Sequence, residues 1–172
     1  MAPGYNMHEN AISDLGVIKE TAALFTFSMV IAGLLNIIGG FFFYQTHQKL
    51  GTLVLYVLAG IGTIGAGLIS LDHPSGLHGL FALTAFLFFN IEAIATTRLI
   101  NGPMKAISAL AGIIGLAFLV VMFLGDAEII TLFGPIGHGG SERMIVYPPI
   151  LWMVAFGGYL MYSPSETEER VA

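Results

Sequence analysis

The stretch TAALFTFSMVIAGLLNIIGGFFFYQTHQ, residues 21–48, decides the fold, because it contains no Asp, Glu, Lys or Arg. Four more apolar runs follow it, over residues 50–71, 77–91, 106–125 and 144–161. A bilayer core of about 30 Å requires roughly 20 apolar residues of helix, in which the backbone polar groups satisfy one another. The sequence therefore predicts an all-α fold, a polytopic bundle of five transmembrane helices.

One domain accounts for the whole chain, with helices predicted over residues 20–46, 50–71, 77–99, 104–125 and 144–162 after an N-terminal segment of residues 1–19. Of the 172 residues, 56% are hydrophobic and 10% are charged, which leaves no room for a soluble catalytic domain. The net charge of -5 argues against a nucleic-acid partner. The absence of Cys excludes disulfides and thiolate metal sites.

Basic residues in the short connections predict the orientation. Lys49 lies between the first two helices, and Arg98 and Lys105 lie between the third and the fourth. Because cytoplasmic loops carry an excess of Lys and Arg, these connections are predicted to be cytoplasmic, together with the C-terminus. The N-terminus and the other connections then lie outside, and with them the side chains of His8, Asp14, Asp72, His73, His78 and His138.

Three of the polar side chains within the predicted spans carry an amide or a carboxyl group well inside an apolar run: Asn36, Asn90 and Glu92. The six residues between Glu92 and the interfacial Arg98, at a rise of about 1.5 Å each, place the carboxylate roughly 9 Å inward. Burying it costs roughly 2.5–3.5 kcal/mol, so we expect it to face another helix or a polar cavity and not lipid. Two roles stay open for Glu92: a proton relay or ligand anchor, and a hydrogen bond that joins two helices.

Glycine and proline positions predict helix packing and a helix start. Gly60-Ile61-Gly62-Thr63-Ile64-Gly65 satisfies the dinucleotide-binding fingerprint, but that motif needs a preceding strand and a helix that starts at it. Here the glycines sit inside an apolar run, so we predict that they let neighbouring helices pack closely. Pro148 and Pro149 are predicted to open the fifth helix, because first-turn amides have no intrahelical acceptor.

Candidate chemistry gathers on the predicted outer face. Ser13 and Asp14 are candidate catalytic residues of a hydrolase that acts on lipid head groups, and capping of the first helix is their alternative role. A divalent metal such as zinc would supply an activated water, and its candidate ligands are Asp72, His73, His78 and His138. The alternative is a pair of helix connections with interfacial histidines, because the loop between His73 and His78 fixes no ligand geometry. These residues converge if the ends of consecutive helices are neighbours.

Several short strings carry a family resemblance. They are Pro3-Gly4-Tyr5, Asn10-Ala11-Ile12-Ser13-Asp14-Leu15-Gly16, His73-Pro74-Ser75-Gly76-Leu77-His78-Gly79, and Glu142-Arg143 ahead of Tyr147-Pro148 and Trp152. Together they resemble the prokaryotic membrane family catalogued as domain of unknown function 998, over nearly the whole chain. The resemblance implies an integral protein of the prokaryotic cell membrane and no particular activity. It also implies a sixth helix ahead of Ser13, so the chain is either a five-helix variant or starts downstream of that helix.

The sequence leaves three functions open. The first is a lipid- or head-group-binding protein or hydrolase that uses the outer Asp and His residues, with membrane lipid as its partner. The second is a non-catalytic subunit, packed against copies of itself or against other membrane subunits. The third is a small transporter that uses Glu92, although the chain shows no internal repeat of the kind transporters carry.

Overall fold

The computed structural model describes residues 2, 4–127, 129 and 134–162, so the predicted cytoplasmic C-terminus lies outside the described part. Its elements are η1 (Ile12–Gly16), α1 (Ala22–His47), α2 (Leu50–Leu68), α3 (Leu77–Thr96), α4 (Pro103–Asp126), η2 (Gly134–Ile136) and α5 (Gly137–Tyr162). In this part of the chain, five helices are long and apolar enough to cross a membrane. The predicted all-α bundle is thereby confirmed.

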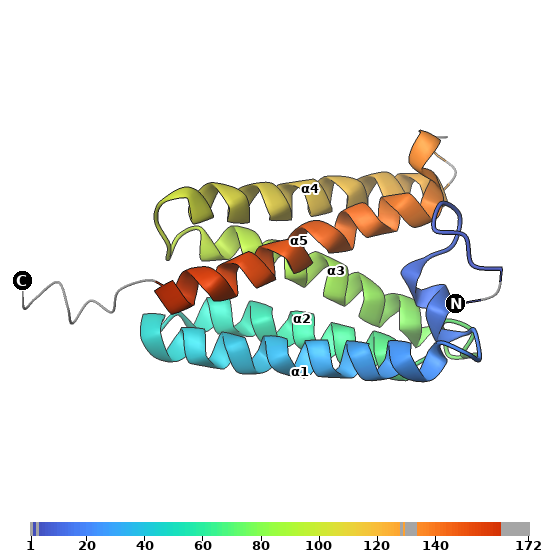
Figure 1. The fold of residues 1–172 in the computed structure, drawn as a ribbon, viewed down its shortest axis with the longest axis horizontal. Coiled ribbons are helices and arrows are strands. Elements are labelled where there is room, and N and C mark those ends of the chain that lie inside the picture. The colour runs from blue at the N-terminus through green and yellow to red at the C-terminus, as the bar shows by residue number, and fades with distance from the viewer. Residues whose placement is uncertain (1, 3, 128, 130–133, 163–172) are drawn as a thin grey trace, which may run out of the picture.

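Successive helices run antiparallel and pack on one another in chain order, α1 on α2, α2 on α3, α3 on α4 and α4 on α5 (Figure 1). α5 also packs on α3. Residues 4–21, which we call the N-terminal segment, include η1 and lie over the end of the bundle where α1, α3 and α5 begin. We call this the N-terminal end of the bundle.

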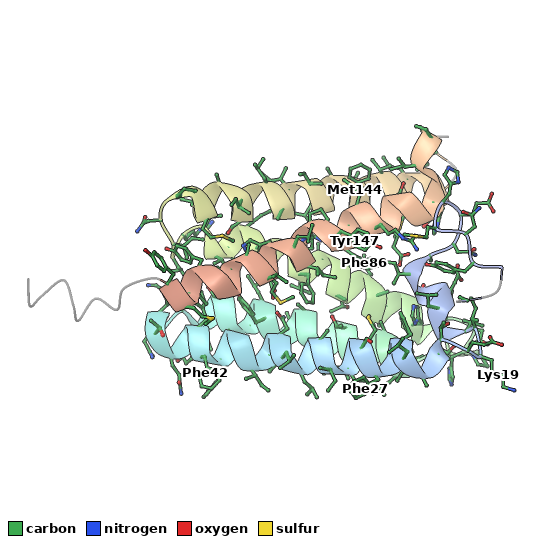
Figure 2. The ribbon with its side chains drawn as sticks, in the orientation of Figure 1. Lys19, Phe27, Phe42, Phe86, Met144 and Tyr147 are labelled. Carbon is green, nitrogen blue, oxygen red and sulfur yellow. The ribbon has the colours of Figure 1, made fainter. Side chains whose placement is uncertain are left out.

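The outside of the bundle is apolar and much of the inside is polar. Phe27 and Phe42 of α1, which point away from the bundle in Figure 2, are 65% and 61% exposed, and Val154 of α5 is 73% exposed. Asn90 and Glu92 of α3 are fully buried. This arrangement is the one that lipid favours, because hydrocarbon offers polar groups no partner.

Glycines bring α2 close to both of its neighbours. A Cβ atom on Gly60 would lie 2.7 Å from the carbonyl oxygen of Gly33 in α1, and one on Gly62 would lie 2.5 Å from the backbone nitrogen of Ala85 in α3. Only a residue without a side chain allows helices to approach so closely. The prediction that these glycines serve packing is confirmed.

The fifth helix differs from its prediction. α5 begins at Gly137 instead of residue 144, and Pro148 and Pro149 lie inside it instead of at its start. The charged pair Glu142 and Arg143 looked like the end of a loop, but both side chains are buried under the N-terminal segment, where they find polar partners. That pairing lets the helix extend through them.

The two prolines remove backbone donors from the middle of α5. Pro149 cannot donate to the carbonyl of Ile145, its acceptor in a regular helix. Asn90 of α3 replaces the missing donor, because its Nδ2 donates to the Ile145 carbonyl over 3.2 Å. A side chain from a neighbouring helix thus satisfies a carbonyl that lipid could not.

Two other helix ends fall short of their predictions. α2 ends at Leu68 instead of residue 71, because Ile69 already has an extended backbone, with φ -102° and ψ 109°. α3 ends at Thr96 instead of residue 99, and residues 97–99 form a turn. Arg98 therefore lies outside the helix.

Candidate functional site

A cavity of about 620 Å³ opens at the N-terminal end of the bundle between the N-terminal segment, α3, α4 and α5, and we call it the polar cavity. Its titratable lining residues are Glu9, Asp14, His78, Asp126, His138 and Glu142. Apolar side chains of α3 and α4, among them Leu83 and Phe123, complete the wall. Neither Lys nor Arg lines it, so the carboxylates dominate its electrostatics.

A second cavity of about 130 Å³ lies deeper in the bundle, and we call it the apolar cavity. Phe25 and Met29 of α1 and Ile145 and Met153 of α5 line it, and η1, α2 and α3 contribute the rest of its wall. α1 contacts α5 through Phe43 and Phe156, whose ring centroids are 5.5 Å apart, and the cavity lies between the two helices on the N-terminal side of that contact.

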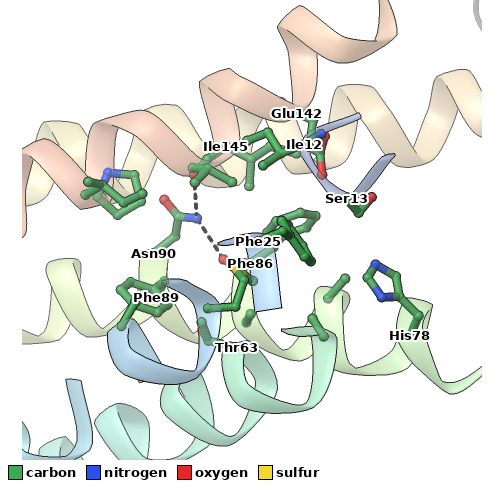
Figure 3. Close-up of a pocket in the computed structure, with 18 of the residues that line it drawn as sticks. Ile12, Ser13, Phe25, Thr63, His78, Phe86, Phe89, Asn90, Glu142 and Ile145 are labelled. Carbon is green, nitrogen blue, oxygen red and sulfur yellow. Dashed lines mark hydrogen bonds between the residues drawn. The ribbon is translucent and has the colours of Figure 1, made fainter. Parts of the chain in front are cut away.

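The two cavities meet. Five residues line both of them: Ser13, His78, Ala82, Phe86 and Glu142. Figure 3 shows Ser13, His78 and Glu142 gathered at one end of the apolar cavity, with Phe89 and Asn90 toward the other. The site therefore consists of two adjoining cavities, an apolar one inside the bundle and a polar one at its N-terminal end.

α5 holds the N-terminal segment in place over this space. The Glu142 carboxylate accepts a hydrogen bond from the backbone nitrogen of Ile12. Arg143 Nη1 donates to the carbonyls of Met7 at 2.9 Å and Asn10 at 3.0 Å, and Nη2 donates to the Tyr5 hydroxyl. Burial raises the pKa of that hydroxyl although Arg143 lowers it, so Tyr5 stays a neutral partner. Glu142 and Arg143 thus hold in place the N-terminal segment, which forms a wall of the polar cavity.

His78 is positioned by the connection between α2 and α3. Gly76 has a φ of 67°, a left-handed conformation that suits glycine, and the chain turns there into α3. His78, in the first turn, is only 3% exposed, and its Nδ1 lies 2.7 Å from the carbonyl oxygen of Ile69 at the end of α2. Because a carbonyl only accepts, Nδ1 carries the proton and Nε2 is the acceptor of the neutral ring.

The predicted outer cluster comes together only in part. Asp14, His78 and His138 line the polar cavity, whereas Asp72 and His73 do not. Asp72 accepts a hydrogen bond from Ser70, and His73 lies 2.9 Å from the Ser75 hydroxyl, so both belong to the exposed α2–α3 connection. Among the described residues, no group of three or more His, Asp or Glu could hold a metal ion. The metal set of Asp72, His73, His78 and His138 is therefore not assembled in the structure.

The candidate catalytic pair has other neighbours. Asp14 Oδ2 accepts hydrogen bonds from the backbone nitrogen of Ala11 at 2.8 Å and from Asn10 Nδ2 at 3.1 Å, which ties up the start of η1. Ser13 lines both cavities, but within the described residues it has no hydrogen bond to His78. The pair serves the shape of the site, with Asp14 in a capping role.

Of the intramembrane polar residues, Asn90 lines the apolar cavity, whereas Asn36 and Glu92 form a cluster apart from both cavities. Asn36 Nδ2 donates to the Tyr56 carbonyl over 3.1 Å and to Glu92 Oε2 over 3.2 Å. The Thr96 hydroxyl donates to the Glu92 carbonyl over 2.8 Å and lies 3.4 Å from the Tyr56 hydroxyl. Glu92 faces protein, as the sequence predicts, and joins α1, α2 and α3. It lines neither of the two described cavities.

Sequence reasoning missed Glu142, Arg143 and Asp126 as site residues. Asp126 Oδ1 lies 3.3 Å from His138 Nε2, which closes one side of the polar cavity. A signal was present in the sequence, because Glu142 and Arg143 directly precede an apolar run, where charges need partners. Their partners are mostly backbone atoms of the N-terminal segment, which no residue pattern reveals.

Comparison with known proteins identifies a family but no individual related protein. The family model described as a protein of unknown function, DUF998, matches residues 1–159. No curated protein and no solved structure matches the chain.

Proposed function

The chain belongs to the DUF998 family of membrane proteins of unknown function, and we propose that it binds a membrane lipid across its two cavities. A segment of a hydrocarbon chain of the lipid lies in the apolar cavity and the head group lies in the polar cavity. The observation that carries the proposal is the wall that the cavities share, formed by Ser13, His78, Ala82, Phe86 and Glu142.

An amphiphile is the ligand class that fits both cavities, because it has an apolar part for the apolar cavity and a polar part for the polar cavity. The apolar cavity offers side chains such as Phe25, Met29 and Met153, which gain free energy by covering an apolar chain. The polar cavity offers carboxylates and imidazoles, which desolvate at a cost unless a polar group replaces water. A purely apolar or purely polar ligand would satisfy one cavity only.

The helix arrangement supports entry from the bilayer. The apolar cavity lies between α1 and α5, on the N-terminal side of the contact that Phe43 makes with Phe156. Both expose apolar side chains, Phe27 at 65% and Val154 at 73%, to the surroundings of the bundle. A lipid chain moving from the bilayer into this space exchanges one apolar environment for another.

Binding takes precedence over hydrolysis in this proposal. Asp14 is engaged with Ala11 and Asn10, and Ser13 has no base hydrogen-bonded to it among the described residues. A nucleophilic serine needs a base within hydrogen-bonding reach. Ser13 and His78 therefore act as walls and head-group contacts.

The test is native mass spectrometry of the protein purified in mild detergent, before and after the junction of the cavities is filled. Ala82 lines both cavities, so Ala82→Phe places a ring where the chain and the head group of the lipid meet. We expect the natural protein to retain a lipid of discrete mass and the variant to lose most of it.

The matched control is Ala117→Phe, the same substitution at an exposed position of α4 that lines neither cavity. This variant should retain the lipid as the natural protein does. Equal retention by all three proteins, or no retained lipid in any, would contradict the proposal.

A further inference from the structure

The polar cavity presents hydrogen-bond acceptors. His78 has Nδ1 bound to the Ile69 carbonyl, and Nε2 has no hydrogen-bond partner among the described residues although the side chain is only 3% exposed. Figure 3 shows its ring pointing from α3 toward Ser13. Nε2 is therefore the acceptor that His78 offers to a ligand in the polar cavity, which it lines.

Two carboxylates add to these acceptors. Glu142 is only 5% exposed and lines both cavities, and it takes its hydrogen bond from Ile12 through Oε2, which leaves Oε1 available. Asp14 takes both of its hydrogen bonds through Oδ2, which leaves Oδ1. Asp126, by contrast, is paired with His138. Among the described residues, the acceptors left for a ligand thus include His78 Nε2, Glu142 Oε1, Asp14 Oδ1 and the carboxylate of Glu9.

The negative charge of the polar cavity favours a ligand group with a positive charge. Glu9, Asp14, Asp126 and Glu142 line it, and no Lys or Arg does. Arg143 lies next to Glu142 in the chain, but its guanidinium is turned to the carbonyls of Met7, Asn10 and Gly139 and to Tyr5. A cationic group would meet attraction in this cavity, so among head groups that share the same phosphodiester the cavity favours one that also carries a cation.

Building on the proposed function, we infer that the head group of the bound lipid carries a primary ammonium, which donates hydrogen bonds to acceptors that line the polar cavity, Glu142 among them. A primary ammonium has N–H donors for these acceptors and a positive charge opposite to that of the carboxylates. A quaternary ammonium has the charge without the donors, and a glycerol head group has donors without the charge. The ligand class is an aminoalkyl phospholipid with the chemistry of phosphatidylethanolamine.

The experiment is a competition among three lipids that share the same chains and the same phosphodiester. The natural protein is incubated in mild detergent with equimolar dioleoyl phosphatidylethanolamine, phosphatidylcholine and phosphatidylglycerol, and the retained lipid is counted by native mass spectrometry. We expect phosphatidylethanolamine to exceed each of the others about tenfold, the factor that one hydrogen bond to a charged group supplies. Equal retention of phosphatidylcholine or of phosphatidylglycerol would overturn the inference.

Glu142→Gln tests the cavity itself. Glutamine keeps an oxygen that can accept from the backbone of Ile12, so the N-terminal segment stays attached, but the negative charge is gone. We expect the preference for phosphatidylethanolamine to fall about tenfold while lipid is still retained. The control is Asp72→Asn, which removes the same charge at the same end of the bundle but outside the cavity, and should leave the preference unchanged.

The outcomes separate this inference from the proposed function. Retention of all three lipids without a preference overturns the ammonium head group and leaves lipid binding standing. Retention of no lipid overturns both. A fourth arm adds soluble glycerophosphoethanolamine in equal amount, which has the head group without the chains. If it displaces phosphatidylethanolamine, the ligand is a free amine and the lipid assignment is overturned.

Discussion

At the scale of single residues, the polar groups inside this bundle replace backbone partners that lipid cannot supply. Asn90 donates to the carbonyl of Ile145, which Pro149 leaves without a helical donor. Asn36 joins the carbonyl of Tyr56 to the carboxyl group of Glu92. Each of these hydrogen bonds joins two helices at a depth where no water is available to pair with an unsatisfied polar group.

Replacing Asn90 with Ala should destabilise the bundle by about 1–2 kcal/mol, because the Ile145 carbonyl loses its donor and the space beside Gly115 is left unfilled. The measurement is the unfolding midpoint of the protein in detergent, followed by circular dichroism. Asn101→Ala is the matched control, since Asn101 is exposed between α3 and α4 and should show no shift. An equal effect of the two substitutions would refute the role given to Asn90.

Glu92→Gln should fold and unfold like the natural protein, whereas Glu92→Leu should lose about 1–2 kcal/mol. Glutamine offers Asn36 Nδ2 the same acceptor, and leucine leaves that donor buried without it. Thermal unfolding of both variants in detergent distinguishes them. If glutamine destabilises as much as leucine, the charge of Glu92 and not its hydrogen bond holds the helices.

For Asn90 and Glu92 the residue pattern predicted a buried environment but not the hydrogen-bond partners. The sequence predicts that Glu92 faces another helix or a polar cavity, because lipid offers an acid inside an apolar run no partner. The hydrogen bond from Asn90 to Ile145 could not be predicted from the sequence, because it depends on the prolines lying inside α5 and not at its start. That fact follows from tertiary contacts of Glu142 and Arg143.

At the scale of secondary-structure elements, α5 and the N-terminal segment depend on each other. α5 starts at Gly137 because the segment covers its first turns, and a Cβ atom on Gly139 would lie 2.2 Å from the carbonyl oxygen of Asn10. In return, Glu142 and Arg143 hold the segment over the polar cavity. Sequence alone assigned residues 137–143 to a loop, because charged residues ahead of an apolar run usually mark the membrane boundary.

Arg143→Ala should release the N-terminal segment while the remaining helices stay folded. The guanidinium donates to three backbone carbonyls and to Tyr5, and alanine satisfies none of them. Hydrogen–deuterium exchange should show faster exchange in peptides covering residues 5–16 and little change in α2. Arg98→Ala, a loss of the same charge at the opposite end of the bundle, is the control. Unchanged exchange in residues 5–16 would contradict the role of Arg143.

At the scale of the whole molecule, the sequence predicted the bundle but not its cavities. Five apolar runs and their spacing were enough for the helices, and Gly60 and Gly62 were enough to show that α2 packs closely on its neighbours. The apolar cavity lies between α1 and α5, on the N-terminal side of the contact of Phe43 with Phe156, and the N-terminal segment forms a wall of the polar cavity. Such spaces depend on the relative placement of elements far apart in the chain, which periodicity does not encode.

The central claim is that one lipid occupies both cavities, and cross-linking with a photoactivatable lipid tests it most directly. One equivalent of phosphatidylethanolamine with a diazirine in its acyl chain is added to the protein in mild detergent, irradiated, and mapped by peptide mass spectrometry. We predict that cross-links concentrate on α1 near Met29 and on α5 near Met153, which line the apolar cavity, and that Ala82→Phe removes them. Labelling that falls equally on exposed side chains such as Phe42, which lines neither cavity, and that Ala82→Phe leaves unchanged, would show that the lipid only coats the bundle.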